Sequence, residues 1–288
     1  MKKTFFALFA ALCFSIPALA DEGSGFIRGD VDLDGSVNIA DVTALIDYLL
    51  SGQWPSEAPE PEVFTVNGVS FTMIPVEGGT FLMGGTEEQE SDREDEYPVH
   101  EVTLSSFSIG QTEVTCELWK AVMGDRPDYP NDMQRPMEAV TWAECQEFIA
   151  ALNEMTGKQF RLPTEAEWEF AARGGNLSEG YKYAGSNNYN DVAWCGGNAY
   201  WAQPVATKAP NELGLYDMSG NVSEWCNDFY GPYTSEAQTN PTGPDSGQEF
   251  VYRGGPYNYP ASASRVAYRY HMEGLNTHKG GLGLRLAL

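Results

Sequence analysis

The side chains with the most specific spacing for chemistry lie in residues 29–52, GDVDLDGSVNIADVTALIDYLLSG. Three aspartates alternate with other residues, a glycine follows where a calcium loop must turn sharply, and a further aspartate closes a loop of twelve residues. The oxygen ligands predicted from this spacing are Asp30, Asp32, Asp34, the carbonyl of Ser36, Asn38 and Asp41. Apolar residues then recur at helical spacing from Ile39 to Leu49, so the sequence predicts a calcium-binding loop that leads into a helix.

Residues 1–20 have the pattern of a signal peptide. Lys2 and Lys3 precede an apolar run over residues 5–16, and small residues within 18–20 suit cleavage after Ala20. The apolar run is too short for a stable membrane span. We therefore expect an exported protein, whether secreted, periplasmic or associated with the cell surface, with no membrane-spanning segment.

The remaining chain is strongly acidic, with 15 basic residues against 41 acidic ones and a formal charge of −26 once Lys2 and Lys3 are removed. Such a chain repels nucleic acid and anionic lipid, so neither is an expected partner. The acidity is explained either by solubility after export or by carboxylates that bind calcium.

Four cysteines remain after the signal peptide, Cys116, Cys145, Cys195 and Cys226. Export permits disulfides, and the sequence does not choose among the three possible pairings. No two of them form a CxxC pair, which argues against a structural zinc site.

Residues 53–62 are rich in Pro and Glu and indicate a linker, followed by one domain over residues 63–288. Capping boxes begin helices at Thr141 and Thr164, which end by Gly157 and Gly174, and a third helix is expected from Thr115 to Gly124. Short strands, as in residues 101–110, and long stretches rich in Gly, Asn and Pro predict an α+β domain with much irregular loop. The acidic run 87–96 indicates a solvated loop. The expected core tryptophans are Trp119, Trp142, Trp168, Trp194 and Trp225.

The last thirty-eight residues, 251–288, contain no cysteine but many side chains that suit a contact surface. Tyr, Asn and His combine rigid aromatic area with adaptable hydrogen bonding. The candidate ligand-binding residues are Tyr257, Asn258, Tyr259, Tyr270, His271, Asn276 and His278. The alternative is an ordinary polar loop with some aromatic rings packed inward.

Residues 29–52 resemble a dockerin repeat, the calcium-loop and helix unit that docks into cohesin modules. The resemblance implies a cohesin module as a partner. A complete dockerin has two such repeats and this chain shows one, so the alternative is a calcium-stabilised cap without a partner.

Residues 63–288 resemble the formylglycine-generating enzymes, also called sulfatase-modifying factors. The resemblance rests on stretches in the family's order, MIPVEGGTFLMGG (73–85), PVHEVTLSSFSIGQTEVT (98–115), RLPTEAEWEFAARGG (161–175), NELGLYDMSGNVSEW (211–225), RGG (253–255) and GLGLR (281–285). It implies an elaborated C-type-lectin-like fold with small twisted sheets, two main helices and extensive loops.

The oxidising members of that family convert a sulfatase cysteine into formylglycine with a copper ion. Two cysteines shortly after RGG bind this copper. Tyr259 and Ser264 stand near those positions in this chain. Copper(I) needs soft thiolate ligands, so we expect no bound copper and no catalytic residues.

The resemblance also implies a structural calcium ion in residues 211–225. Its ligands would be the side chains of Asp217 and Glu224 and the backbone oxygens of Gly220 and Val222. All-oxygen coordination suits calcium. The alternative is that the two carboxylates cap local turns.

Some non-enzymatic relatives resemble the variable proteins of diversity-generating retroelements, in which a C-terminal segment is mutagenised to vary a binding face. This chain ends in GLGLRLAL after such a segment. We therefore expect a calcium-stabilised, non-catalytic binding protein for a protein or glycan ligand. The alternatives are an oxidase acting on sulfatases and a structural part of a cohesin–dockerin assembly.

Overall fold

The computed structural model describes residues 59–126, 130–274 and 278–288. The chain divides into two compact units, Met1–Pro59 and Glu60–Leu288, and the second unit is the one described below. The predicted signal peptide, the calcium loop with its ligands and Asn276 lie outside the described residues. In the described part, no helix is both long enough and apolar enough to cross a membrane.

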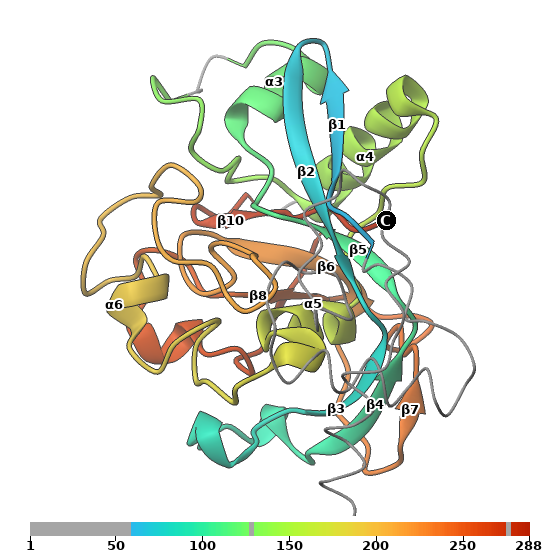
Figure 1. The fold of residues 1–288 in the computed structure, drawn as a ribbon, viewed down its shortest axis with the longest axis vertical. Helices are drawn as coiled ribbons and strands as arrows, with labels where there is room; N and C mark the ends of the chain where they lie inside the picture. The colour runs from blue at the N-terminus through green and yellow to red at the C-terminus, as the bar shows by residue number, and fades with distance from the viewer. Residues whose placement is uncertain (1–58, 127–129, 275–277) are drawn as a thin grey trace, which may run out of the picture. The chain divides into compact units, whose positions relative to one another are not determined.

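The first sheet has the order β1-β2-β5 and is antiparallel throughout (Figure 1). Strands β1 (Glu62–Val66) and β2 (Val69–Val76) form a hairpin, and β5 (Phe107–Gly110) pairs with the far half of β2. The hairpin turns at Asn67 and Gly68, whose φ angles are 49° and 85°. Asn-Gly suits this two-residue turn because both central residues need a positive φ. Strand β1 begins at Glu62, one residue before the predicted start of the domain.

The second sheet has the order β3-β4-β7. Strand β3 (Gly79–Met83) is antiparallel to β4 (His100–Leu104), and β4 is parallel to the short β7 (Gln238–Thr239). The segment 101–110 therefore contains parts of two strands, β4 and β5, which belong to different sheets.

The third sheet has the order β10-β6-β8-β9 and carries the C-terminal segment. Strand β6 (Ser223–Phe229) is parallel to β10 (Leu282–Gly283) and antiparallel to β8 (Phe250–Arg253). Strand β9 (Tyr270–Met272) is antiparallel to β8 at the edge. Strands β6, β8, β9 and β10, which span residues 223–283 without β7, thus meet in one layer.

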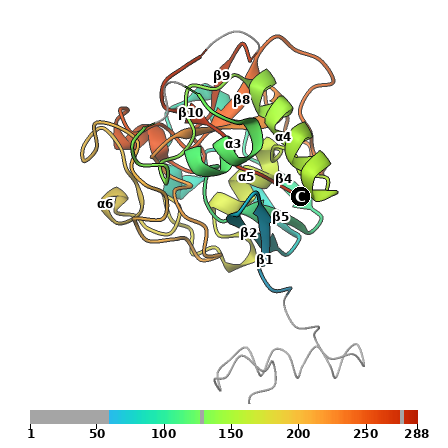
Figure 2. The same cartoon turned by 90° about the horizontal axis from the view of Figure 1, so that it is seen from above.

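The three longer helices begin where the sequence predicts. Helix α3 (Cys116–Met123) has Thr115 as its N-cap, and α4 (Trp142–Thr156) and α5 (Glu165–Ala172) begin with the predicted capping boxes. Each capping threonine accepts a hydrogen bond from the backbone of the third helical residue, which satisfies an otherwise unpaired donor. A fourth, short helix is α6 (Tyr189–Val192), and Figure 2 shows it on the side of the domain opposite α4. Four 3-10 turns complete the described elements, η1 (Glu87–Gln89), η2 (Glu94–Glu96), η3 (Gly175–Leu177) and η4 (Ala261–Ser264).

The third sheet separates two hydrophobic clusters of the core. Side chains alternate along a strand, so Phe250 and Tyr252 of β8 pack with α3 and α4 while Val251 packs with α5. Figure 1 shows the same layering, with α3 and α4 on one side of β6 and β8 and α5 on the other. The third sheet is therefore packed against helices on both faces, within a domain of three small sheets, few helices and long loops that agrees with the predicted mixed fold.

Three of the predicted core tryptophans, Trp119, Trp168 and Trp225, are at most 2% exposed. Trp142 is half-buried and packs against the hydrophobic cluster that contains Phe250 and Tyr252. The prediction is wrong for Trp194, which is half-buried at the surface, where its Nε1 donates to the Thr207 hydroxyl at 3.0 Å.

The prediction of a solvated loop for residues 87–96 is wrong for Gln89 and Glu96, which are 0% exposed. Glu96 is buried because it forms an ion pair with Arg265 at 2.6 Å. Arg265 is far away in the sequence, so local charge density alone could not indicate this contact.

Candidate functional site

Four buried arginines attach the C-terminal segment to the rest of the domain. None is more than 4% exposed, and they come from the RGG, RVAYR and GLGLR motifs: Arg253, Arg265, Arg269 and Arg285. Each forms charged hydrogen bonds with at least one buried glutamate. Removing one partner of such a pair leaves an uncompensated buried charge, so these motifs hold the intervening loops in place.

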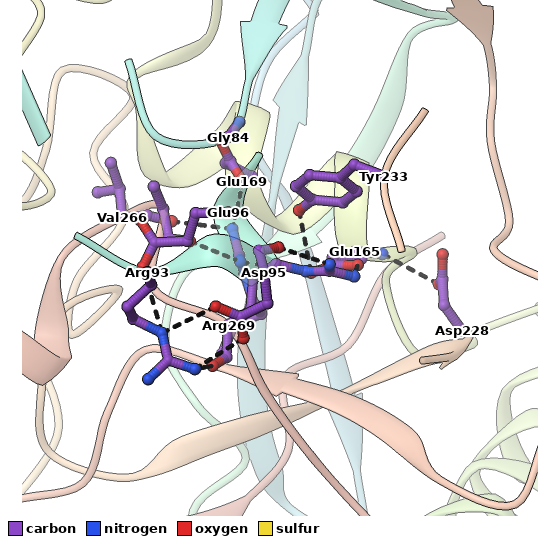
Figure 3. Close-up of polar contacts among 12 residues, drawn as sticks. Gly84, Arg93, Asp95, Glu96, Glu165, Glu169, Asp228, Tyr233, Val266 and Arg269 are labelled. Atoms are coloured by element: carbon purple, nitrogen blue, oxygen red, sulfur yellow. Dashed lines mark hydrogen bonds and ion pairs between the residues drawn. The ribbon is translucent and has the colours of Figure 1, made fainter. Parts of the chain in front are cut away.

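Two of these arginines contact helix α5, and Figure 3 shows part of this network. Arg269 donates from Nε to Glu165 at 2.7 Å, and Arg253 donates to both Glu165 and Glu169. Burial opposes ionisation of Glu165, but the charges of Arg269 and Arg253 outweigh it and lower the pKa of this carboxyl. Tyr233 donates its hydroxyl to the same carboxylate at 3.2 Å.

Strand pairing between β8 and β9 brings together the tyrosines of the candidate site. Tyr252 lies opposite Tyr270, and their rings stack with centroids 4.9 Å apart and planes 9° apart. Tyr259 meets Tyr270 edge-on at 6.1 Å. We call Tyr252, Tyr259 and Tyr270 the tyrosine cluster; Tyr252 is 4% exposed, and the other two are half-buried.

Lys279 contacts all three rings of the tyrosine cluster. Its Nζ donates to the Tyr252 hydroxyl at 2.6 Å and lies 4.8 Å, 5.4 Å and 5.8 Å from the centroids of Tyr252, Tyr259 and Tyr270. Burial raises the pKa of Tyr252 and of Tyr270, so both phenols are neutral near pH 7. The ammonium is therefore held by ring faces and a hydroxyl rather than by a phenolate.

A second cation extends this aromatic surface. The Arg93 guanidinium lies 4.2 Å above the Tyr268 ring and donates to its hydroxyl at 2.8 Å. Tyr268 in turn contacts Tyr270, with 4.6 Å between centroids. Unlike Lys279, Arg93 also forms an ion pair, with Asp95 at 2.7 Å.

The predicted histidines do not join the tyrosine cluster. His271 follows Tyr270 in β9, so alternation directs its side chain to the other face, where it stacks on Tyr230 at 3.8 Å and bonds Glu249 at 2.8 Å. His278 is exposed and bonds Glu144 of α4 at 3.1 Å.

Tyr257 interacts with Glu138 and Arg135, which line a cavity of about 280 Å³, while Asn258 is exposed. Glu138, one of its lining residues, accepts a hydrogen bond from the Gly281 backbone at 2.6 Å and, after burial, contributes to the raised pKa of Tyr257. The other lining residues are Cys116, Pro130, Arg135, Pro136, Met137, Ala139 and Gly280. Arg135 and Glu138 form an ion pair at 3.7 Å, so the lining of the cavity includes a charged pair beside the C-terminal segment.

The positions at which the family resemblance expects copper ligands carry oxygen. Tyr259 belongs to the tyrosine cluster, and Ser264 is 0% exposed with an Oγ that has no hydrogen-bond partner. The four cysteines that follow the predicted signal peptide are all buried, and none belongs to residues 251–288. Phenol and hydroxyl groups do not fit copper(I).

Asp217 and Glu224, two predicted calcium ligands, lie in a buried group of acids with Glu113. Both oxygens of Glu224 bond Arg285, and Trp168 donates its Nε1 to the same carboxylate at 2.6 Å. Asp217 accepts from the Ala206 backbone at 2.7 Å through Oδ2, while its Oδ1 is buried without a partner.

The pKa of Asp217 is raised to about 6, mainly by burial and also by the charge of Glu224. Burial, Asp217 and Glu224 raise the pKa of Glu113 well above its usual value. Both pKa values stay raised although Arg285 lowers them, so a further positive charge beside these acids would be favourable. Among the described residues, no three Asp, Glu, His or Cys side chains converge as a metal cluster, so calcium here would depend on backbone oxygens as well. Gly220 and Val222, the predicted backbone ligands, both lie in the segment between Asp217 and Glu224.

Tyr252, Lys279 and Arg93 belong to the aromatic surface but were not among the residues that the sequence indicated. Tyr252 lies in the strand-like stretch FVYR, where alternation places it on the opposite face from Val251. No sequence signal connects Arg93 or Lys279 to those tyrosines.

Residues 59–288 match the family of the sulfatase-modifying factor enzyme 1-like domain. The chaperone protein LppX of Paenibacillus barcinonensis is 31% identical over 266 residues, which cover 74% of this chain and 88% of that protein. The formylglycine-generating enzyme of Streptomyces coelicolor is 35% identical over 188 residues, covering 59% of this chain and 57% of the enzyme. The chain thus spans little more than half of that enzyme.

Among solved structures, Treponema denticola variable protein 1 is similar to this domain, with a TM-score of 0.73 and 31% identity. The similarity covers 80% of this chain and 99% of the variable protein.

Proposed function

The chain belongs to the family of sulfatase-modifying factor enzyme 1-like domains, and we propose that in this member the domain binds a ligand without catalysis. The binding face is the tyrosine cluster with Tyr257, Asn258 and the adjoining cavity beside Arg135 and Glu138.

The observation that carries this proposal is the chemistry of positions 259 and 264. An oxidase of this family needs two thiolates close to RGG, and the chain has a phenol and a hydroxyl there. The arginines of the surrounding motifs nevertheless keep their buried glutamate partners. The framework that positions the segment is thus retained while the sulfur donors are missing.

The similarity to the Treponema variable protein supports the same reading, because it covers nearly all of that protein. By this proposal, the side chains of residues 256–279 outside the RVAYR motif (265–269) vary between copies of the gene, while RGG, RVAYR and GLGLR stay constant. Sequencing the gene across many cells of its natural population tests the idea. Substitutions concentrated at codons 256–264 and 270–279 are expected, and an even spread along the gene would remove the diversified face from the proposal.

The rival function is a formylglycine-generating oxidase that uses another route. Its test is incubation of the purified protein with copper and a Cys-x-Pro-x-Arg peptide, with mass spectrometry for the aldehyde. We expect no aldehyde, and its formation in a copper-dependent manner would replace the binding proposal with an oxidase.

Calcium is part of the proposal at two places. The buried acids Glu113, Asp217 and Glu224 share one arginine, and the unpartnered Oδ1 of Asp217 is an oxygen that a cation would satisfy. The loop of residues 30–41 supplies a second set of ligands by its spacing. Export of the chain and attachment through a cohesin module belong to the proposal as well. A cohesin pull-down with and without chelator tests the attachment: retention only with calcium supports it, and no retention removes it.

A further inference from the structure

The tyrosine cluster is already occupied by a cation of the chain itself. Lys279 places its ammonium within 6 Å of three aromatic centroids, the range in which a cation is attracted to the ring quadrupole. The Tyr252 hydroxyl accepts one of its three N–H donors at 2.6 Å. The geometry is thus that of a site for a primary ammonium group.

Lys279 is held in this site without help from an acid. Among the ion pairs of the described residues, none includes Lys279. Two carboxylates contact its neighbours in the sequence instead: Glu138 accepts from the Gly281 backbone, and Glu144 bonds His278. Most other basic side chains of the described domain have a carboxylate within ion-pair distance, for example Lys182 with Glu90 at 2.6 Å. The ammonium of another lysine could make the same contacts with the three rings and the Tyr252 hydroxyl, so Lys279 can be exchanged for it.

The charge of the chain favours the same class of ligand. The full sequence has a formal charge of −24, which attracts cationic partners and repels acidic ones. Tyr259 and Tyr270 are half-buried, as is Lys279, so the site is reachable from the surface. Two of the three tyrosines are held in place by the fold, which preserves the site. Tyr252 lies in strand β8, and Tyr270 donates its hydroxyl to the Ala263 carbonyl at 3.1 Å.

We propose that the tyrosine cluster binds the ammonium group of a lysine side chain presented by a protein ligand, and that Lys279 takes this place in the free protein. The inference rests on the proposed function, because it names the ligand chemistry of the same face. A ligand lysine must displace Lys279, so the apparent affinity of the free protein is reduced by the fraction of molecules in which Lys279 occupies the site.

The test uses the full chain and a small probe, Nα-acetyl-lysine methylamide, followed by the NMR signals of the tyrosine rings. Replacing the occupant with Lys279→Ala is expected to tighten probe binding about tenfold, since a cation–aromatic contact with a hydrogen bond is worth roughly one decade in affinity. Lys158→Ala is the matched control, because it removes the same charge from a lysine that lies over another ring, that of Phe64, outside the tyrosine cluster, and it should leave probe affinity unchanged. Adding Tyr259→Ala to Lys279→Ala should weaken binding again, and a thermal melt verifies that each variant is folded.

Two further probes define the chemistry. The Nε-acetylated form of the probe lacks the charge and should not bind, while glucosamine carries a primary ammonium on a sugar and should bind more weakly than the lysine probe. Equal affinity of Lys279→Ala and the unmodified protein, binding of the acetylated probe, or stronger binding of glucosamine would each overturn the inference. Such a result would leave the proposed function standing if codons 256–264 and 270–279 still prove variable, whereas an even spread of substitutions removes the diversified face whatever the probe does.

Discussion

Asp228 offers the sharpest test of the buried electrostatics in this domain. It lies in β6, is 3% exposed, and accepts a hydrogen bond from the Glu165 backbone at 3.0 Å, at the start of α5 (Figure 3). Burial, and then the charge of Glu165, raise the pKa of this carboxyl from 3.8 to about 8. Near neutral pH the folded protein therefore holds a proton on Asp228 that the unfolded chain releases.

The sign of the pH dependence follows from this difference. The stability contributed by the protonated carboxyl is complete below about pH 4 and is lost as pH rises through about 8, because the unfolded state binds fewer protons over this window. Each pH unit costs about 1.4 kcal/mol, which gives an upper bound of about 6 kcal/mol over the whole window. Asp228→Asn keeps an oxygen to accept the Glu165 N–H but cannot ionise, so it should remove this loss.

The measurement is urea unfolding of the unmodified protein and Asp228→Asn between about pH 5 and about pH 8. As the pH rises, the unfolding free energy of the unmodified protein should fall relative to that of Asp228→Asn by about 1.4 kcal/mol per pH unit. Asp245→Asn, at an exposed position, is the control and should run parallel to the unmodified protein. Parallel curves for Asp228→Asn as well would refute the reasoning, since they would mean that Asp228 titrates alike in both states.

Two further predictions concern the buried charges. Arg253→Met leaves Glu169 without one of its arginines inside the core and should lower the unfolding free energy by about 3–5 kcal/mol in urea; a loss below about 1 kcal/mol would show that the pair is dispensable. For the calcium site, saturating calcium should raise the melting temperature relative to chelator, corresponding to about 2.7 kcal/mol at a hundredfold excess over Kd. Asp217→Asn should reduce that rise when unfolding of the domain is followed by tryptophan fluorescence, and an unchanged rise would exclude Asp217 as a ligand.

Local signals in the sequence predicted the helices well. Thr141 and Thr164 begin α4 and α5 with capping boxes, because the threonine and the glutamate three residues later satisfy backbone donors within a single turn. The family motifs likewise predicted the fold, since they cover the whole domain in order. These features depend on residues close in sequence or on a pattern shared along the chain.

The partners of the C-terminal segment were decided only by the tertiary structure. Glu96 was predicted to be solvated and is buried because Arg265 reaches it from a distant part of the chain. Tyr270 and His271 were both predicted to contact a ligand; as adjacent strand residues they point to opposite faces, and the register with β8 places Tyr270 opposite Tyr252.

The sequence alone therefore determined the family, the helix starts and the missing thiols at positions 259 and 264, because each of these can be read from residue types and their spacing. The tertiary structure decided which aromatic rings form the tyrosine cluster and that Lys279 lies among them. Such contacts join segments far apart in the chain, and they exist only once strand register and buried ion pairs have placed those segments together.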